Sequence, residues 1–214
     1  MCFGPSLVSL LPELPPGDWN DALITKGADH RPHVTVKQTQ LPEVQNTWHD
    51  TYVDYLKLSI RRKIRTGIYE VECSSFDRAV VAKFARFPWE IRYIQNETTA
   101  YQWISGHGIG PQFLGHLTEE GRAIGFLMEY ITDARHAVVQ DVEACRKVLS
   151  RLHGLGVRHG DTNRFNFLIR DSKAILIDFD TAQKCDDPAR LLQEMEDVSA
   201  CLEDLNARGG GGLL

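Results

Sequence analysis

The sequence of 214 residues lacks the long apolar run of a membrane-spanning helix, because no stretch approaches about 20 apolar residues. It also lacks the start of a secretory signal peptide. Its first basic residue is Lys26, so the apolar run 7–11 has no positively charged region before it. We therefore expect a soluble, intracellular protein, cytoplasmic or nuclear, with no membrane span.

An excess of positive charge is also missing. The chain carries 24 Lys and Arg against 29 Asp and Glu, which gives a net charge of −5 with neutral His. This balance argues against general nucleic-acid binding, which depends on clustered Lys and Arg. With 43% hydrophobic and 25% charged residues, the composition is that of a globular protein of one domain or two small lobes.

Paired cysteines are absent as well, since the five cysteines are odd in number and none belongs to a Cys-x-x-Cys motif. In a chain long enough to bury a hydrophobic core, this pattern is typical of free thiols in a reducing compartment. No Cys and His cluster has the spacing of zinc ligands, so we expect no zinc site. The cysteines are Cys2, Cys73, Cys145, Cys185 and Cys201.

Residues 1–50 show little periodic pattern, because repeated prolines interrupt them. We expect an extended N-terminal segment with one short strand at 34–38. Three roles stay open for this extension: packing on the next region, covering its functional site, or binding a protein partner.

Residues 51–131 predict five antiparallel strands and one helix. Apolar residues alternate with polar ones in the first two strands, and β-branched residues are frequent in the third. The helix follows Pro88, where apolar residues recur at helical spacing until Gly106. The expected strands lie around 56–60, 69–73, 78–85, 113–117 and 123–131.

Residues 132–208 predict a smaller, mainly helical region. A helix over 141–155 has an apolar stripe and ends at Gly156. Two short apolar strands, 167–169 and 174–177, follow on either side of a four-residue turn.

A last helix has a clear beginning. Asp187 fits the N-cap position and Pro188 the first helical position. Apolar residues then recur at spacings of three and four, which predicts one buried face. After the glycines that end this helix, we expect a flexible tail over 209–214.

The strongest functional signal is the sequence H-G-D-T-N-R-F-N at 159–166, followed by I-L-I-D-F-D at 175–180. Phosphoryl transfer needs a carboxylate that orients the attacking hydroxyl, and oxygen ligands that hold Mg²⁺ against the phosphates. Asp161 suits the first role, and Asn166 and Asp178 suit the second. Taken singly, each is better explained as a turn or strand-end residue, but their joint spacing favours a metal–nucleotide site.

These segments resemble the catalytic and metal-binding loops of the protein-kinase-like superfamily, H-x-D-x-x-x-x-N and D-F-x. The H-G-D and D-F-D forms are similar to the atypical branches, which include aminoglycoside and choline phosphotransferases, lipopolysaccharide kinases and small Rio-type kinases. The resemblance covers roughly residues 55–205. It implies an α+β, two-lobed fold, with an antiparallel five-stranded N-lobe plus one helix and an abbreviated helical C-lobe. It also implies ATP and Mg²⁺ as cofactors.

The sequence V-V-A-K at 80–83 resembles the strand that carries the phosphate-binding lysine. Strand alternation puts Val81 and Lys83 on one face, so the resemblance implies Lys83 on the phosphates and Val81 over the adenine. Glu97 lies within the apolar stripe of the predicted helix, where a carboxylate is costly unless it is paired. We expect an ion pair with Lys83 that orients the lysine, as in this family. The alternative is that Glu97 lies at the edge of the stripe and reaches water.

The sequence F-L-M-E-Y-I at 126–131 resembles the strand that leads into the hinge of this family. The resemblance implies that Met128 lies beside the adenine, and that backbone groups of Glu129 and Ile131 form hydrogen bonds to the base. A plain core strand is the simpler alternative, and it also buries Met128.

Three features depart from the family pattern. The turn at 61–67 has one Gly and four basic residues in place of a Gly-rich loop. It either supplies charge to phosphates or forms a solvated hairpin tip. Gly160 replaces the Arg of H-R-D, so we expect no switching by a phosphorylated activation loop. No A-P-E motif follows Asp180, which weakens the case for peptide recognition more than the case for nucleotide binding.

We predict an ATP- and Mg²⁺-dependent phosphotransferase that acts on a hydroxyl of a protein Ser or Thr, with Asp161, Lys83 and Glu97 as its catalytic residues. Two alternatives stay open. The H-G-D motif favours a small-molecule kinase of the aminoglycoside or choline type. The missing Gly-rich loop favours a pseudokinase that binds nucleotide and a partner protein.

Overall fold

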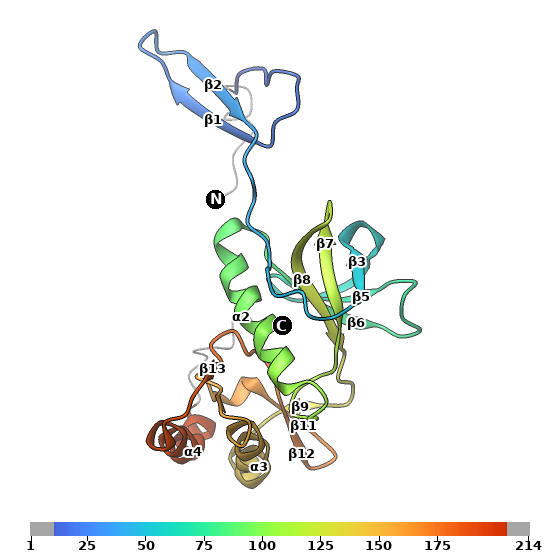
Figure 1. Cartoon of the computed structure of the whole chain (residues 1–214), viewed down its shortest axis with the longest axis vertical. Helices are drawn as coiled ribbons and strands as arrows, with labels where there is room; N and C mark the ends of the chain where they lie inside the picture. Colours follow the sequence, from blue (N-terminus) through green and yellow to red (C-terminus); the bar gives the residue numbers. More distant parts are fainter. Residues whose placement is uncertain (1–10, 205–214) are drawn as a thin grey trace. The chain divides into compact units, whose positions relative to one another are not determined.

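The computed structural model describes residues 11–204, and the chain divides into two compact units after Pro42 (Figure 1). The predicted tail at 209–214 lies outside the described residues. Between residues 11 and 204, no helix is long and apolar enough to cross a membrane. Four cysteines in this range are free, namely Cys73, Cys145, Cys185 and Cys201.

The first unit contains a β-hairpin, where the sequence predicted one short strand. Strand β1 (Asp21–Lys26) pairs antiparallel with β2 (Pro32–Lys37). The turn is closed by a hydrogen bond from the Gly27 N–H to the Arg31 carbonyl, at 2.8 Å. Strand β1 escaped prediction because its apolar residues Leu23 and Ile24 are adjacent, so no period-two alternation marks it.

The second unit, 43–204, is α+β and is built on a six-stranded mixed sheet with the strand order β3-β7-β8-β6-β5-β4. Five antiparallel strands were expected, and this expectation is wrong in one respect. An additional strand, β3, pairs parallel to β7 at one edge. The strands are β3 (Tyr52–Asp54), β4 (Ser59–Arg65), β5 (Ile68–Glu72), β6 (Val80–Phe84), β7 (Phe113–Glu119) and β8 (Arg122–Glu129).

Strand β3 was missed because a three-residue strand is too short to show a period. The alternation that predicted a strand from Leu56 is instead interrupted by a 3₁₀ turn at Tyr55–Lys57. The Asp54 side chain caps this turn by accepting a hydrogen bond from the Leu56 N–H at 2.8 Å. Leu56 is therefore 88% exposed and contributes nothing to the core.

Helix α2 (Ile91–Ile104) packs against β6 and β8 on one face of this sheet (Figure 1). It begins after Pro88 and ends before Gly106, as predicted. Glu90 prepares its first turn, because its Oε2 atom accepts a hydrogen bond from the Arg86 N–H at 2.7 Å. Its buried residues are Ile91, Ile94, Glu97, Thr98, Ala100, Tyr101 and Ile104.

The rest of the second unit holds two helices, a three-stranded sheet in the order β12-β11-β9 and the strand pair β10-β13. Helix α3 packs against β12 and α4. The predicted start of α4 is confirmed, since Asp187 Oδ1 accepts a hydrogen bond from the Ala189 N–H at 2.9 Å. The elements are β9 (Arg135–His136), α3 (Val142–His153), β10 (Val157–Arg158), β11 (Phe167–Arg170), β12 (Lys173–Leu176), β13 (Gln183–Lys184) and α4 (Pro188–Glu203).

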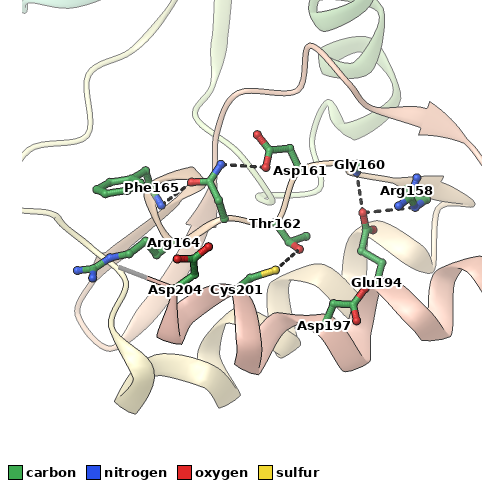
Figure 2. A pocket seen from close by; sticks show the side chains of 11 residues that line it. Arg158, Gly160, Asp161, Thr162, Arg164, Phe165, Glu194, Asp197, Cys201 and Asp204 are labelled. Carbon is green, nitrogen blue, oxygen red and sulfur yellow. Dashed lines mark hydrogen bonds and ion pairs between the residues drawn. The ribbon is translucent and has the colours of Figure 1, made fainter. Parts of the chain in front are cut away.

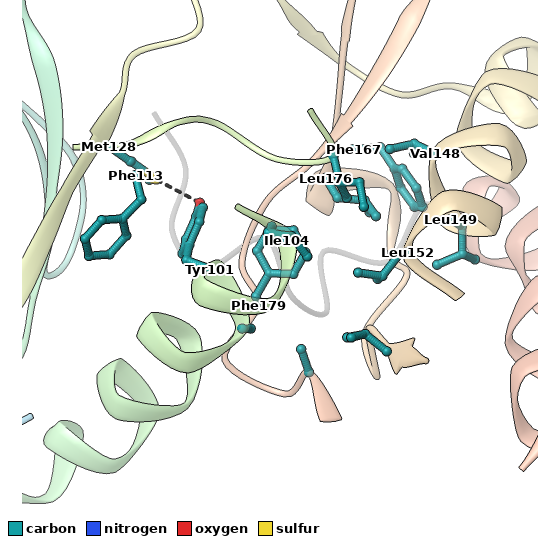
Figure 3. Close-up of a cluster of buried hydrophobic side chains, with 14 of the residues drawn as sticks. Tyr101, Ile104, Phe113, Met128, Val148, Leu149, Leu152, Phe167, Leu176 and Phe179 are labelled. Carbon is teal, nitrogen blue, oxygen red and sulfur yellow. Dashed lines mark hydrogen bonds between the residues drawn. The ribbon is translucent and has the colours of Figure 1, made fainter. Parts of the chain in front are cut away.

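Strand β6 separates two hydrophobic clusters because its side chains alternate between the two faces of the sheet. Val80, Ala82 and Phe84 face the smaller cluster, while Val81 belongs to the larger one. The larger cluster continues from α2 and the sheet to α3 and β11–β12, which ties these elements together. Figure 3 shows part of it, with Tyr101, Ile104, Phe113, Met128, Val148, Leu149, Leu152, Phe167, Leu176 and Phe179 labelled.

Candidate active site

A cleft of about 360 Å³ opens between the six-stranded sheet and the strands β9, β11 and β12. Apolar side chains line it from two sides. Ile68, Val81 and Met128 come from the sheet, and Leu168 and Ile177 come from β11 and the end of β12. Of the predicted site residues, the cleft brings together Val81, Lys83, Glu97, Met128, Glu129, Ile131 and Asp178.

Lys83 is held between two carboxylates in this cleft. Its Nζ atom lies 2.5 Å from Glu97 Oε2 and 2.5 Å from Asp178 Oδ1. The expected ion pair between β6 and α2 is therefore present, and Asp178 joins it. The Glu97 side chain is only 1% exposed, so it does not lie at a wet edge of the helix.

The charges of this triad follow from burial and proximity. Burial alone would lower the pKa of Lys83, but Glu97 and Asp178 raise it above its ordinary value. Burial would raise the pKa of Asp178, yet the Lys83 ammonium holds that pKa below its usual range. Burial raises the pKa of Glu97, against the opposing effect of Lys83. Asp178 thus stays ionised, as a metal-binding carboxylate must.

The backbone turns sharply at Asp178 to make this contact. Its φ of 64° lies in the left-handed region, which is unfavourable for a residue with a side chain. The next residue, Phe179, is fully buried, and its N–H lies 3.4 Å from Glu97 Oε1. This turn thus places the Asp178 side chain in the cleft and the Phe179 side chain in the hydrophobic core.

Asn166 connects Asp161 to the residues that precede Asp178. Its Nδ2 group donates to the Asp161 carbonyl at 3.0 Å and to Asp161 Oδ2 at 3.2 Å. Its own carbonyl accepts from the Ile177 N–H at 3.0 Å. Asn166 is 1% exposed, and its Oδ1 atom is buried with no hydrogen-bond partner. A buried acceptor without a donor needs a partner, and a metal ion is one that suits an amide oxygen.

Like Asn166, Asp161 does not line the cleft with the other predicted residues. Asp161 lines a second hollow of about 240 Å³, between residues 158–165 and α4 (Figure 2). Its Oδ1 atom accepts a hydrogen bond from Asn163 Nδ2 at 2.9 Å, which orients the carboxylate. Arg164 also lines this hollow.

The basic turn at 61–67 directs only some of its charges to the cleft. Arg62 and Arg65 line the cleft, and Arg65 also lowers the pKa of Asp178, after the larger effects of burial, Lys83 and His159. Arg62 donates a hydrogen bond to the Tyr130 hydroxyl at 2.8 Å. Arg61 instead pairs with Glu72 at 2.9 Å. Positive charge therefore reaches the cleft from side chains of this turn.

The backbone requires a glycine at position 160. Its φ is 87°, and a Cβ atom there would lie 2.8 Å from the Thr181 carbonyl. Thr181 also donates its hydroxyl to the His159 carbonyl at 3.0 Å. Asn96 on α2 donates to the Asp180 carbonyl at 2.5 Å. The segment after Asp178 is thus held by direct contacts to α2 and to the catalytic loop.

Glu194 on α4 contacts the segment that contains His159 and Gly160, a contact that the sequence did not predict. It is 3% exposed and accepts a hydrogen bond from the Gly160 N–H at 2.6 Å (Figure 2). It also accepts one from the His159 N–H at 3.1 Å. His153 Nε2 lies 2.8 Å from it. Glu194 carries the same sequence signal as Glu97, because it lies three residues after Leu191 and four before Val198, in the apolar stripe of its helix.

Replacement of Glu194 is expected to destabilise the segment that contains His159 and Gly160. Burial would raise the pKa of Glu194, but His153 and the backbone N–H groups lower it, so the carboxylate is charged. Glu194→Ala leaves the buried N–H of His159 and the N–H of Gly160 without their acceptor, and should lower the free energy of unfolding by about 2–5 kcal/mol. Urea denaturation measures this change. The control is Glu196→Ala on the exposed side of α4, and equal stability of the two variants would contradict this role.

Within residues 11–204, no group of three or more His, Cys, Asp or Glu side chains is placed to hold a metal ion. A Mg²⁺ site formed by one carboxylate, one amide oxygen and nucleotide phosphates is of a different kind, because Mg²⁺ usually keeps several non-protein ligands. No protein-family model matches this chain and no curated protein matches it, so its function has to be inferred from the site itself.

Proposed function

We propose that this protein is an ATP- and Mg²⁺-dependent phosphotransferase with a two-lobed, protein-kinase-like fold. In this proposal it transfers the γ-phosphate of ATP to a hydroxyl of a protein Ser or Thr. The observation that supports it most is the position of Lys83, 2.5 Å from both Glu97 and Asp178 in an apolar-walled cleft. A buried cation oriented by two carboxylates suits the binding of nucleotide phosphates.

The cleft fits a planar base. Val81 and Met128 on one side, with Leu168 and Ile177 on the other, would enclose the adenine between apolar surfaces. The Glu129 N–H already donates to the Gln112 carbonyl at 2.8 Å. We therefore assign the hydrogen bonds to the base to the Glu129 carbonyl and the Ile131 N–H.

Asp178 and Asn166 are the residues that would hold Mg²⁺. Asp178 is ionised, and the Oδ1 atom of Asn166 is a buried oxygen without a hydrogen-bond partner. Both are hard oxygen ligands of the kind Mg²⁺ prefers. When bound, the metal neutralises negative charge on the phosphates. Lys83 and Arg65 would add positive charge on the protein side.

Asp161 would orient the acceptor hydroxyl. The oxygen of this hydroxyl forms a bond to the γ-phosphorus, its proton passes to Asp161, and the bond from phosphorus to the ADP oxygen breaks. Arg164, which lines the same hollow, would face the transferred phosphate.

Asp178→Ala should weaken Mg·ATP binding by at least about tenfold, because the charged metal ligand is lost. Isothermal titration with ATP, with and without Mg²⁺, measures this effect. Asp186→Ala, which removes an exposed carboxylate nearby in the chain, is the matched control. If well-folded wild-type protein binds no ATP, or if Asp178→Ala binds Mg·ATP as tightly as wild type, the proposed site is wrong.

A small-molecule acceptor is the second candidate, because Asp161 lines a hollow of only about 240 Å³. Labelled ATP offered with protein extracts and, separately, with small alcohols and amino alcohols distinguishes the two. Nucleotide binding without any transfer would instead favour a pseudokinase.

A further inference from the structure

A third hollow, of about 460 Å³, lies apart from the residues that line the cleft and from Asp161. Helix α3 lines one side and the turn between β11 and β12 lines the other, and Gly108 also lines it. The residues that line it carry four cationic groups: Lys147 and Arg151 on α3, and Arg170 and Lys173 at the turn.

Carboxylates do not balance this charge. Asp171 is the single acidic residue among the described residues that line the hollow. Within the described part of the chain, Lys147, Arg170 and Lys173 form no ion pair. Such an accumulation of positive charge is unexpected in a chain with a net charge of −5.

The local structure places like charges next to each other on both walls. Lys147 and Arg151 are four residues apart on α3 and therefore share one face of the helix. Arg170 and Lys173 are directly opposite each other in the register of β11 and β12. Like-charge pairs in both arrangements are destabilising. A bound anion would relieve this repulsion on both walls at once.

Three of these groups are positioned by the backbone. Arg151 donates to the Gly108 carbonyl at 3.2 Å and also to the His107 carbonyl, which fixes its guanidinium at the rim. Asp171 and Ser172 have φ angles of 50° and 58°, the conformation of a tight two-residue hairpin turn. This turn holds Arg170 and Lys173 together.

We propose that this hollow binds a compact polyanion that carries two or more phosphate groups. Guanidinium and ammonium groups are the usual protein ligands of phosphate. Four cationic groups exceed the charge of one monoanion, and the hollow has room for more than one phosphate. This site is independent of the proposed phosphotransferase activity.

Isothermal titration of the full chain with sodium tripolyphosphate, in EDTA so that no divalent cation contributes, tests the proposal. Wild type should bind tripolyphosphate. Lys147→Gln/Lys173→Gln should bind it at least about tenfold more weakly in this hollow, because two charge-assisted contacts are lost. The control Lys57→Gln/Arg190→Gln removes two exposed cations elsewhere and should bind as wild type. Arg65→Gln removes one cation from the cleft and reports any tripolyphosphate that binds there.

Three results would overturn the site: no binding by wild type, equal weakening by Lys57→Gln/Arg190→Gln, or weakening by Arg65→Gln alone. Thermal unfolding without ligand adds a check on folding, since Lys147→Gln/Lys173→Gln should be at least as stable as wild type. Sedimentation with phosphatidylcholine vesicles, with and without phosphorylated phosphoinositide, identifies the source. Wild-type binding that Lys147→Gln/Lys173→Gln abolishes indicates a lipid headgroup, and tripolyphosphate binding without sedimentation indicates a soluble ligand.

Discussion

Asp161→Ala is expected to abolish phosphate transfer and to leave Mg·ATP binding intact. Asp161 lines the hollow beside α4 and not the cleft that contains Lys83, so its removal deletes no group from the nucleotide side. Loss of the group that orients the hydroxyl and accepts its proton should lower the transfer rate by about 10²–10⁴-fold. Transfer from labelled ATP, and slow release of ADP where no acceptor is supplied, measure this rate.

Two further variants distinguish a loss of catalysis from a loss of folding in this test. Asp161→Asn keeps the shape of the side chain, so it should lose transfer as Asp161→Ala does while unfolding at the wild-type temperature. Asp186→Ala should retain full activity, because Asp186 is exposed and lines neither hollow. Retained turnover in both Asp161 variants would remove this residue from the catalytic role.

Lys83→Met is expected to destabilise the protein as well as to weaken ATP binding. Methionine approximates the length of the side chain but removes the charge, so Glu97, which is 1% exposed, stays buried without its cation. Breaking a buried ion pair from one side costs about 3–5 kcal/mol. Urea unfolding of Lys83→Met and of Lys57→Met, an exposed lysine, measures the difference.

The double variant Lys83→Met/Glu97→Gln provides the rescue. It removes the uncompensated carboxylate and should recover much of the lost stability, since replacing both partners costs less than removing one. ATP binding should stay weak, because the cation that faces the phosphates is still missing. If the double variant is as unstable as Lys83→Met, the loss does not come from Glu97.

The stability loss in Lys83→Met should depend on pH. Burial raises the pKa of Glu97, and removal of Lys83 eliminates the main effect that opposes this rise. An acid whose pKa is higher in the folded state binds more protons there than in the unfolded state. Its favourable contribution to the free energy of unfolding is therefore complete below its unfolded pKa, about 4.3. That contribution is lost as the pH rises through the pKa of Glu97 in the folded state. Lys83→Met should therefore lie closest to wild-type stability near pH 5 and fall further below it towards pH 8.

Several parts of the candidate site were predictable because their signals are local. A carboxylate in an apolar helical stripe needs a partner, and this requirement leads from Glu97 to Lys83 along the chain alone. Glu194 occupies the same kind of position in an apolar helical stripe. Its partners include backbone N–H groups, which have no signature in the sequence. The contact of Lys83 with Asp178 depends on a left-handed backbone at residue 178, which spacing does not reveal.

The sequence by itself determined the elements with strong periodicity and caps, such as α2 and the start of α4 at Asp187, and the residue types of the candidate site. The spacing of apolar side chains and the capping residues are features of a few neighbouring residues, so they can be recognised in the sequence. The tertiary structure alone decided that β3 pairs parallel to β7, that β1 has a partner, and that four cations converge between α3 and the β11–β12 turn. Strand pairing and charge convergence join segments far apart in sequence, and the free energy of such contacts depends on the whole fold rather than on neighbouring residues.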